Sequence, residues 1–208
     1  LSDALAVSFD QQIGHDYFVD ADERFDFYHK VEHKIPFDLD LFNKITNGGV
    51  PNKTLNVILA GTGVGKSLFM CHHAANCYSA NLNVLYITCE MAEERIAERI
   101  DANLMDVTMD ELRHLPKIAY DRKLSKATGS IKSRLIVKEY PTATANVNHF
   151  RHLLDELKLK KNFQPDVIFI DYLNICSSAR FKQGGNVNSY MYIKSIAEEL
   201  RGLAVERD

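Results

Sequence analysis

The chain has 208 residues, of which 46% are hydrophobic, and this size suits one cored domain with an appendage. Its formal net charge is −3, which excludes a strongly basic nucleic-acid binder, so any DNA contact would need a local basic patch. We find no signal peptide and no apolar run of bilayer length, and therefore expect a cytoplasmic protein with no membrane partner. Four scattered cysteines in or beside apolar segments indicate buried, reduced thiols.

Residues 1–34 are predicted to form an arm, separate from a core domain in residues 35–208. A short amphipathic helix is predicted for residues 1–9. Residues 16–34 combine many charges with aromatic side chains that need a surface to cover. Either the chain's own domain or a neighbouring subunit could provide that surface, and the sequence leaves both open. The aromatic residues are Tyr17, Phe18, Phe25, Phe27 and Tyr28.

Residues 60–67 form the motif Ala-Gly-Thr-Gly-Val-Gly-Lys-Ser, which is typical of a phosphate-binding P-loop. The apolar residues 55–59 before it predict a buried strand, and residues 68–80 after it predict a helix, as the motif requires. Glycines permit backbone conformations that a Cβ disfavours, so that N–H groups at the helix start can point at an anion. The predicted nucleotide-binding residues are Gly61, Thr62, Gly63, Val64, Gly65, Lys66 and Ser67.

Within this loop, Lys66 would reach the β- and γ-phosphates and the Ser67 hydroxyl would hold Mg²⁺. Ala60 departs from the general pattern, which begins with glycine. The alternative interpretation is an ordinary glycine-rich turn in an α/β protein.

Residues 83–90 predict a second buried strand that ends in the carboxylate of Glu90. Ligands of open α/β sheets bind beyond the carboxyl ends of the strands, so Glu90 could orient and deprotonate an attacking water. Alternatively, Glu90 could complement the dipole of the helix predicted for residues 91–101. The residues alone leave both interpretations open.

A third strand is predicted for residues 134–140, after a polar segment, residues 104–133, that favours a solvated helix pair. Residues 167–171 then give four apolar residues and Asp171, the Walker B pattern, whose carboxylate binds the Mg²⁺ shell through water. This strand is predicted to continue through Tyr172 and Leu173. Since strands alternate with helices, we predict an α/β fold with a mostly parallel sheet covered by helices.

Residues 177–190 are predicted to form a mildly basic, amide-rich loop, followed by a last helix to about residue 206. Arg180, Lys182 and Asn186 are its candidate DNA-binding residues. Composition alone leaves open whether this loop contacts a nucleic-acid backbone or is only a connection.

Taken together, these motifs give the chain a resemblance to the DnaB-type hexameric replicative helicases, which have a RecA-like ATPase core. It looks closest to the helicases of T-even-like phages. Those helicases often begin the Walker A loop with alanine, as Ala60 does here. The resemblance also rests on Glu90-Met91, where the family carries its catalytic glutamate, and on Asp171-Tyr172-Leu173, the family's form of Walker B.

The resemblance implies an ATP-hydrolysing motor that encircles single-stranded DNA and unwinds the duplex, with Glu90 and Lys66 as catalytic residues. It implies ATP bound between subunits of a hexamer, with Mg²⁺ held through Ser67 and Asp171. It implies primase and a helicase loader as partners, the host cytoplasm as location if a phage encodes the chain, and an arm that docks on a neighbouring subunit.

Two departures from the family qualify these expectations. By comparison with that family, we expect the sequence to lack the amino-terminal collar that meets primase and to stop before the glutamine sensor, a later DNA-binding loop and the arginine finger. We therefore expect a fragment that hydrolyses ATP poorly alone, with an exposed sheet edge. The alternatives are a RecA/RadA-like recombinase, a KaiC-like ATPase or a non-catalytic nucleotide-binding module.

Overall fold

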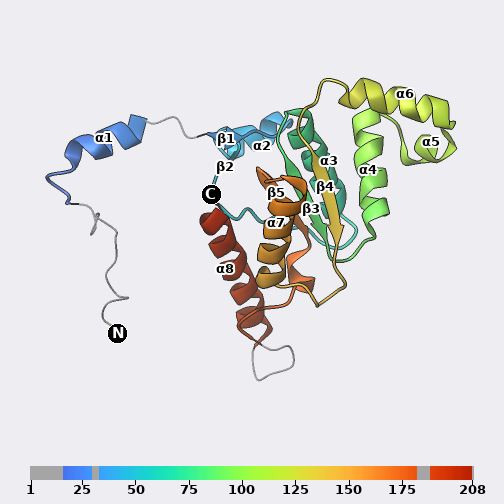
Figure 1. Cartoon of the computed structure of the whole chain (residues 1–208). Helices are drawn as coiled ribbons and strands as arrows, with labels where there is room; N and C mark the ends of the chain where they lie inside the picture. The colour runs from blue at the N-terminus through green and yellow to red at the C-terminus, as the bar shows by residue number, and fades with distance from the viewer. Residues whose placement is uncertain (1–15, 30–32, 182–187, 208) are drawn as a thin grey trace. The chain divides into compact units, whose positions relative to one another are not determined.

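The computed structural model of the chain describes residues 16–29, 33–181 and 188–207 (Figure 1). It divides into two units, Leu1–His33 and Lys34–Asp208. In the first unit, helix α1 (Ala21–His29) follows a turn in which the Asp16 carboxylate accepts the N–H groups of Phe18 and Val19. No residue of α1 is buried. The helix predicted for residues 1–9 lies outside the described residues.

The second unit is built on a parallel sheet of three strands in the order β4 (Leu135–Glu139), β3 (Val84–Thr88) and β5 (Val167–Asp171). Thr88, at the end of β3, lies opposite Glu139 on one side and Asp171 on the other. Every residue of β3 is buried because it is the central strand and both its faces are covered. The sheet confirms the predicted parallel α/β arrangement.

Two pairs of helices cover the two faces of this sheet (Figure 1). Successive side chains of a strand point to opposite faces, so β3 contributes to two cores. Val84 and Tyr86 pack against α3 (Lys66–Ser79) and α4 (Glu93–Met105). Leu85 and Ile87 pack against α7 (Val147–Lys161) and α8 (Ser189–Arg207). The result is a three-layer domain, helices–sheet–helices, in which the carboxyl ends of the three parallel strands lie at one edge of the sheet.

Two short helices, α5 (Met109–His114) and α6 (Lys117–Thr128), connect α4 to β4. The Thr108 hydroxyl and the Glu111 carboxylate form a capping box that fixes the start of α5. Neither helix has a buried residue. This confirms the predicted solvated helix pair outside the sheet. No helix in the described part of the chain is long and apolar enough to span a bilayer.

The prediction of a buried strand over residues 55–59 is wrong in this structure. These residues form neither helix nor strand, and Val57, Ile58 and Leu59 are 65%, 40% and 94% exposed. A strand needs a neighbour to satisfy its backbone groups. Among the described residues β5 pairs only with β3, so no ladder includes residues 55–59.

The predicted continuation of β5 through Tyr172 and Leu173 is also wrong. The strand ends at Asp171, the Asp171–Tyr172 peptide bond is cis, and a 3₁₀ turn, η2 (Leu173–Ile175), follows. The N–H groups of Ile175 and Cys176 bond to the carbonyl oxygens of Tyr172 and Leu173, which turns the chain away from the sheet.

Strands β1 (Lys34–Ile35) and β2 (Val50–Pro51) pair antiparallel, and the segment between them, which includes α2 (Asp40–Ile45), packs on α3 through the rings of Phe37 and Phe42. His73 of α3 is 5% exposed and stacks on Phe37 with ring centroids 4.4 Å apart. Burial lowers the pKa of His73 to about 4, against a partly offsetting attraction from the Asp38 carboxylate.

This histidine makes the domain sensitive to acid. The unfolded chain binds a proton at His73 below pH 6.5, whereas the folded chain does so only near pH 4, so stability falls as the pH drops between these values. Between pH 7.5 and 4.5 we expect His73 to account for about 2–3 kcal/mol of lost unfolding free energy. Urea titrations at both pH values give the loss of unfolding free energy for wild type and for His73→Leu. The difference between the two losses is the contribution of His73.

The exposed His152, on α7, provides the matched control. His152→Gln should lose as much stability as wild type between the two pH values. An equal loss in wild type and in His73→Leu would contradict the assignment to His73.

Candidate nucleotide-binding site

The P-loop places backbone N–H groups and one ammonium at the start of α3. Gly63 and Gly65 have φ values of +75° and +108°, which favour glycine, and Gly65 is the N-cap of the helix. A Cβ on Gly63 would meet nothing within 4 Å, so backbone conformation and not space requires glycine there. The free N–H groups of the first helical turn then point toward any anion bound at the loop.

Lys66 lies across this loop. Its ammonium Nζ donates to the carbonyl oxygens of Ala60 and Gly61 at 3.2 and 3.1 Å. Gly61, Thr62, Gly63 and Val64 are exposed, and Ser67 is half-buried. The loop therefore offers an accessible surface of N–H groups and one positive charge, a combination suited to phosphate.

Asp171 ends β5 at the carboxyl edge of the sheet and is 1% exposed. Its Oδ2 accepts the Tyr86 hydroxyl at 3.0 Å. Its Oδ1 is buried and has no hydrogen-bond partner among the residues that the structure describes. A buried carboxylate oxygen without a donor is costly unless a cation or a water of its shell binds it. Mg²⁺ takes such oxygen ligands, so Asp171 and the hydroxyl of Ser67 fit a magnesium site.

Contacts across the sheet show which face of α3 looks toward Asp171. The thiol of Cys71 donates to the Tyr86 hydroxyl oxygen at 3.8 Å. Residues four apart in a helix share a face, so Ser67 lies one turn before Cys71 on that face. Burial raises the pKa of Tyr86, so its hydroxyl keeps its proton and remains a donor to Asp171.

Glu90 lies on a turn just beyond β3, with its side chain exposed. The Thr88 hydroxyl donates to the Met91 carbonyl and accepts the Met91 N–H, which closes the turn around Glu90. The Cys89 N–H donates to the Asp171 carbonyl at 2.8 Å. Glu90 therefore follows the carboxyl end of β3, beside the end of β5 that carries Asp171.

The helix after Glu90 begins at Glu93, two residues later than predicted, with Ala92 as its N-cap. Its first turn already contains the carboxylates of Glu93 and Glu94, which complement the helix dipole. Glu90 precedes that turn.

Arg180 is the only one of the three candidate DNA-binding residues within the described chain; Lys182 and Asn186 lie outside it. Its guanidinium pairs with Glu198 of α8 at 3.0 Å, on an exposed surface. A surface ion pair of this kind is weak and could exchange for a phosphate.

Glu199, which we did not predict from the sequence, anchors the start of this loop. Its buried carboxylate accepts the Ser178 hydroxyl at 2.7 Å and the N–H groups of Ala179 and Arg180 at 2.9 and 3.4 Å. The signal was present in the spacing, because Glu199 shares a helix face with Ile196 and Leu203. A carboxylate within such an apolar stripe is buried and needs donors.

Removing this anchor should destabilise the domain. We expect Glu199→Ala to lower the free energy of unfolding by about 2–3 kcal/mol, because Ser178 and two N–H groups lose a charged partner. Urea denaturation followed by circular dichroism measures the loss. The exposed neighbour is the control, and Glu198→Ala should stay within about 0.5 kcal/mol of wild type. Equal losses in both variants would show that Glu199 is not a special anchor.

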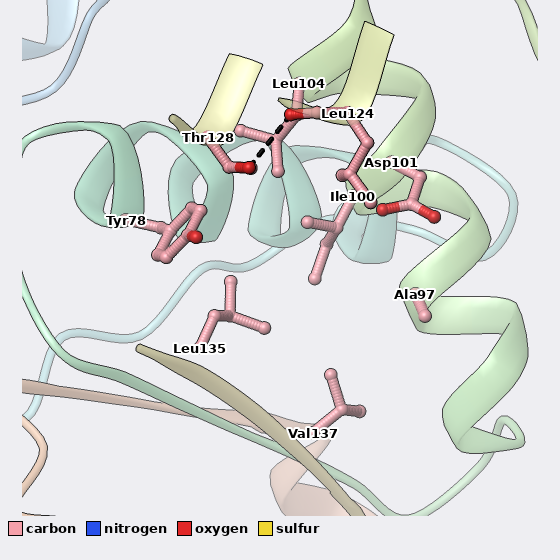
Figure 2. A pocket seen from close by; sticks show the side chains of 9 residues that line it. All are labelled: Tyr78, Ala97, Ile100, Asp101, Leu104, Leu124, Thr128, Leu135 and Val137. Carbon is pink, nitrogen blue, oxygen red and sulfur yellow. Dashed lines mark hydrogen bonds between the residues drawn. The ribbon is translucent and has the colours of Figure 1, made fainter. Parts of the chain in front are cut away.

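A cavity of about 250 Å³ lies elsewhere, between α4, α6 and β4 (Figure 2). Its walls are mostly apolar, and the carboxylate of Asp101 at its side accepts the Tyr120 hydroxyl at 2.8 Å. No P-loop residue lines it, nor does Glu90 or Asp171. No lysine, arginine or histidine lines it, and Asp101 adds a negative charge, so it does not suit a phosphate. The lining residues are Tyr78, Ala97, Ile100, Asp101, Leu104, Leu124, Thr128, Leu135 and Val137.

A family model described as the DnaB-like helicase C terminal domain matches residues 35–208. The chain belongs to this family. The resemblance found in the sequence is thereby confirmed.

Two relatives of this DnaB-like domain are replicative helicases by name. A DnaB-like replicative helicase of Enterobacteria phage T4 is 50% identical over 208 residues, which cover 99% of this chain and 44% of that protein. A probable plasmid replicative DNA helicase of Chlamydia psittaci is 28% identical over 152 residues, 72% of this chain and 32% of that protein. The chain thus spans less than half the length of either relative.

Solved structures show the same fold. A DnaB-like replicative helicase, described with its interactions with primase, matches with a TM-score of 0.68 and 19% identity, over 99% of this chain and 49% of that one. A second structure, described as an ATPase domain, matches with a TM-score of 0.65 and 20% identity, over 92% and 68% of the two chains. At these identities the likeness supports the RecA-like fold of the DnaB-like domain.

Proposed function

We propose that the chain is the ATPase motor core of a replicative DNA helicase, which binds Mg-ATP and couples its hydrolysis to unwinding. The observation that carries this proposal is the edge formed by the P-loop, Glu90 and Asp171, where Asp171 Oδ1 has no partner among residues 16–29, 33–181 and 188–207. Membership of the DnaB-like family supports it.

Each group at this edge has a proposed part in the reaction. The P-loop N–H groups and the Lys66 ammonium bind the phosphates and stabilise charge that develops on them. Ser67 and Asp171 hold Mg²⁺, which supplies positive charge against the β- and γ-phosphates when it is bound. Glu90 orients the attacking water and accepts its proton.

The DNA contact is proposed at the loop that follows Ser178. Arg180 would exchange its bond to Glu198 for a phosphate oxygen of single-stranded DNA, and Lys182 and Asn186 would add contacts. The exposed aromatic side chains of α1, such as Phe25 and Phe27, suit docking on a neighbouring subunit. A hexamer, with primase and a helicase loader as partners by family resemblance, completes the proposal, and its location is the cytoplasm, that of the host cell if a phage encodes the chain.

ATP hydrolysis with and without single-stranded DNA tests this function, with Lys66→Ala as the blank and ATP binding as the companion measurement. DNA-stimulated hydrolysis that the variant lacks supports the motor. Tight ATP binding without turnover, even with added subunits that supply an arginine, would favour a non-catalytic nucleotide-binding module. DNA strand exchange without unwinding would favour a RecA/RadA-like recombinase. ATP turnover at the same rate with and without DNA would favour a KaiC-like ATPase.

A further inference from the structure

We propose that Tyr86 is a positioning residue that orients Asp171 toward the metal of the nucleotide site. The proposal rests on the proposed function, because it assumes that Asp171 holds the magnesium shell. It adds a residue outside the P-loop and Walker B motifs, contributed by the middle of the central strand.

The tyrosine ring is fixed by its neighbours in the sheet. Tyr86 lies opposite Phe169 in the register of β3 and β5, and the two rings stack with centroids 5.8 Å apart and planes 15° apart. Tyr86 is fully buried. Since Asp171 lies two residues beyond Phe169 on the same face of β5, the hydroxyl of the fixed ring reaches its carboxylate.

The Cys71 thiol of α3 determines the direction in which the Tyr86 hydroxyl proton points. A phenol oxygen donates one hydrogen bond and can accept others. The Cys71 thiol of α3 donates to this oxygen, so the tyrosine proton points at Asp171 Oδ2 at 3.0 Å. With Oδ2 occupied in this way, Oδ1 is the oxygen left for the metal shell.

Two different elements thus fix one carboxylate: β3 through Tyr86, and the P-loop helix through Cys71. Removing a group that hydrogen-bonds to a metal-binding side chain typically weakens metal affinity by about 10–100-fold. If Tyr86 only filled the core, loss of its hydroxyl would change stability but not metal binding.

The test measures Mn²⁺ binding to the chain with a non-hydrolysable ATP analogue, by electron paramagnetic resonance of the metal. Tyr86→Phe should weaken Mn²⁺ binding about 10-fold and leave metal-free analogue binding unchanged. Tyr120→Phe is the matched control, because it removes the same kind of bond, from Tyr120 to Asp101 at 2.8 Å, away from the site. It should leave Mn²⁺ affinity unchanged.

Asp171→Asn supplies the reference for losing the carboxylate. The double variant Tyr86→Phe with Asp171→Asn should bind Mn²⁺ no more weakly than Asp171→Asn, because the tyrosine acts through the aspartate. Mn²⁺ affinity of Tyr86→Phe within two-fold of wild type, beside a clear loss in Asp171→Asn, would overturn the proposal. A wild type without analogue binding, or an Asp171→Asn without effect, would instead contradict the proposed function.

Circular dichroism first checks that Tyr86→Phe folds. If it does not, Cys71→Ala gives the result, since it removes the thiol that orients the hydroxyl and leaves the tyrosine in place. We expect Cys71→Ala to weaken Mn²⁺ binding. Unchanged affinity in Cys71→Ala would then overturn the proposal.

Discussion

Replacing Glu90 with glutamine is expected to lower the rate of ATP hydrolysis by about 10²–10⁴-fold, the usual contribution of a positioned general base. Glutamine keeps the size of the side chain but cannot accept the proton of the attacking water. ATP binding should stay within about two-fold of wild type, because the P-loop N–H groups and Lys66 are unchanged. Phosphate release and titration with a fluorescent ATP analogue measure the two quantities, both with single-stranded DNA present.

Glu94 offers a matched control, since it lies in the first turn of α4, just after Glu90, and is exposed. Glu94→Gln should hydrolyse ATP at the wild-type rate. Wild-type turnover in Glu90→Gln would remove this residue from the chemistry and return it to the alternative role of a helix-end charge.

Shortening Phe150 to alanine should cost about 3–5 kcal/mol of unfolding free energy, the range for large aromatic side chains in a core. Phe150 is 1% exposed within the core between the sheet and α7 and α8. Its ring meets that of Tyr140 edge-on, with centroids 5.8 Å apart. Alanine would leave a cavity and lose this contact. Urea denaturation followed by circular dichroism is the measurement.

Leu159 lies on the same helix, α7, and is 84% exposed. Leu159→Ala should change the free energy of unfolding by less than about 0.5 kcal/mol. A loss below about 1 kcal/mol in Phe150→Ala would mean that the core on this face closes around the gap and is less tightly packed than the structure indicates.

The sequence predicted β3, β4 and β5 because each is a short apolar run between polar segments. The same signal failed at residues 55–59. Apolar content can be read locally, but a strand also depends on a partner strand, which a local pattern does not contain. A correct apolar pattern without a partner strand therefore gave a wrong element.

The candidate site was predictable only where each residue carries a signal in its own stretch of sequence. Residues 61–67 form a continuous motif, and Asp171 and Glu90 each end an apolar run. Tyr86 was missed because its partner Asp171 lies 85 residues away. A buried tyrosine does require a hydrogen-bond partner, so its position within an apolar strand was a usable signal, although it could not name that partner.

The position of β3 has a consequence for synthesis of the chain. This central strand is made first, while its partner β4 begins about 50 residues later and β5 later still. At roughly 5–20 residues per second, β3 waits roughly 3–10 s on the ribosome with two unpaired edges. Its apolar side chains and open edges can meanwhile associate with other nascent chains. We expect slower translation of residues 90–134 to increase aggregation, and a chaperone that shields apolar strands to reduce it.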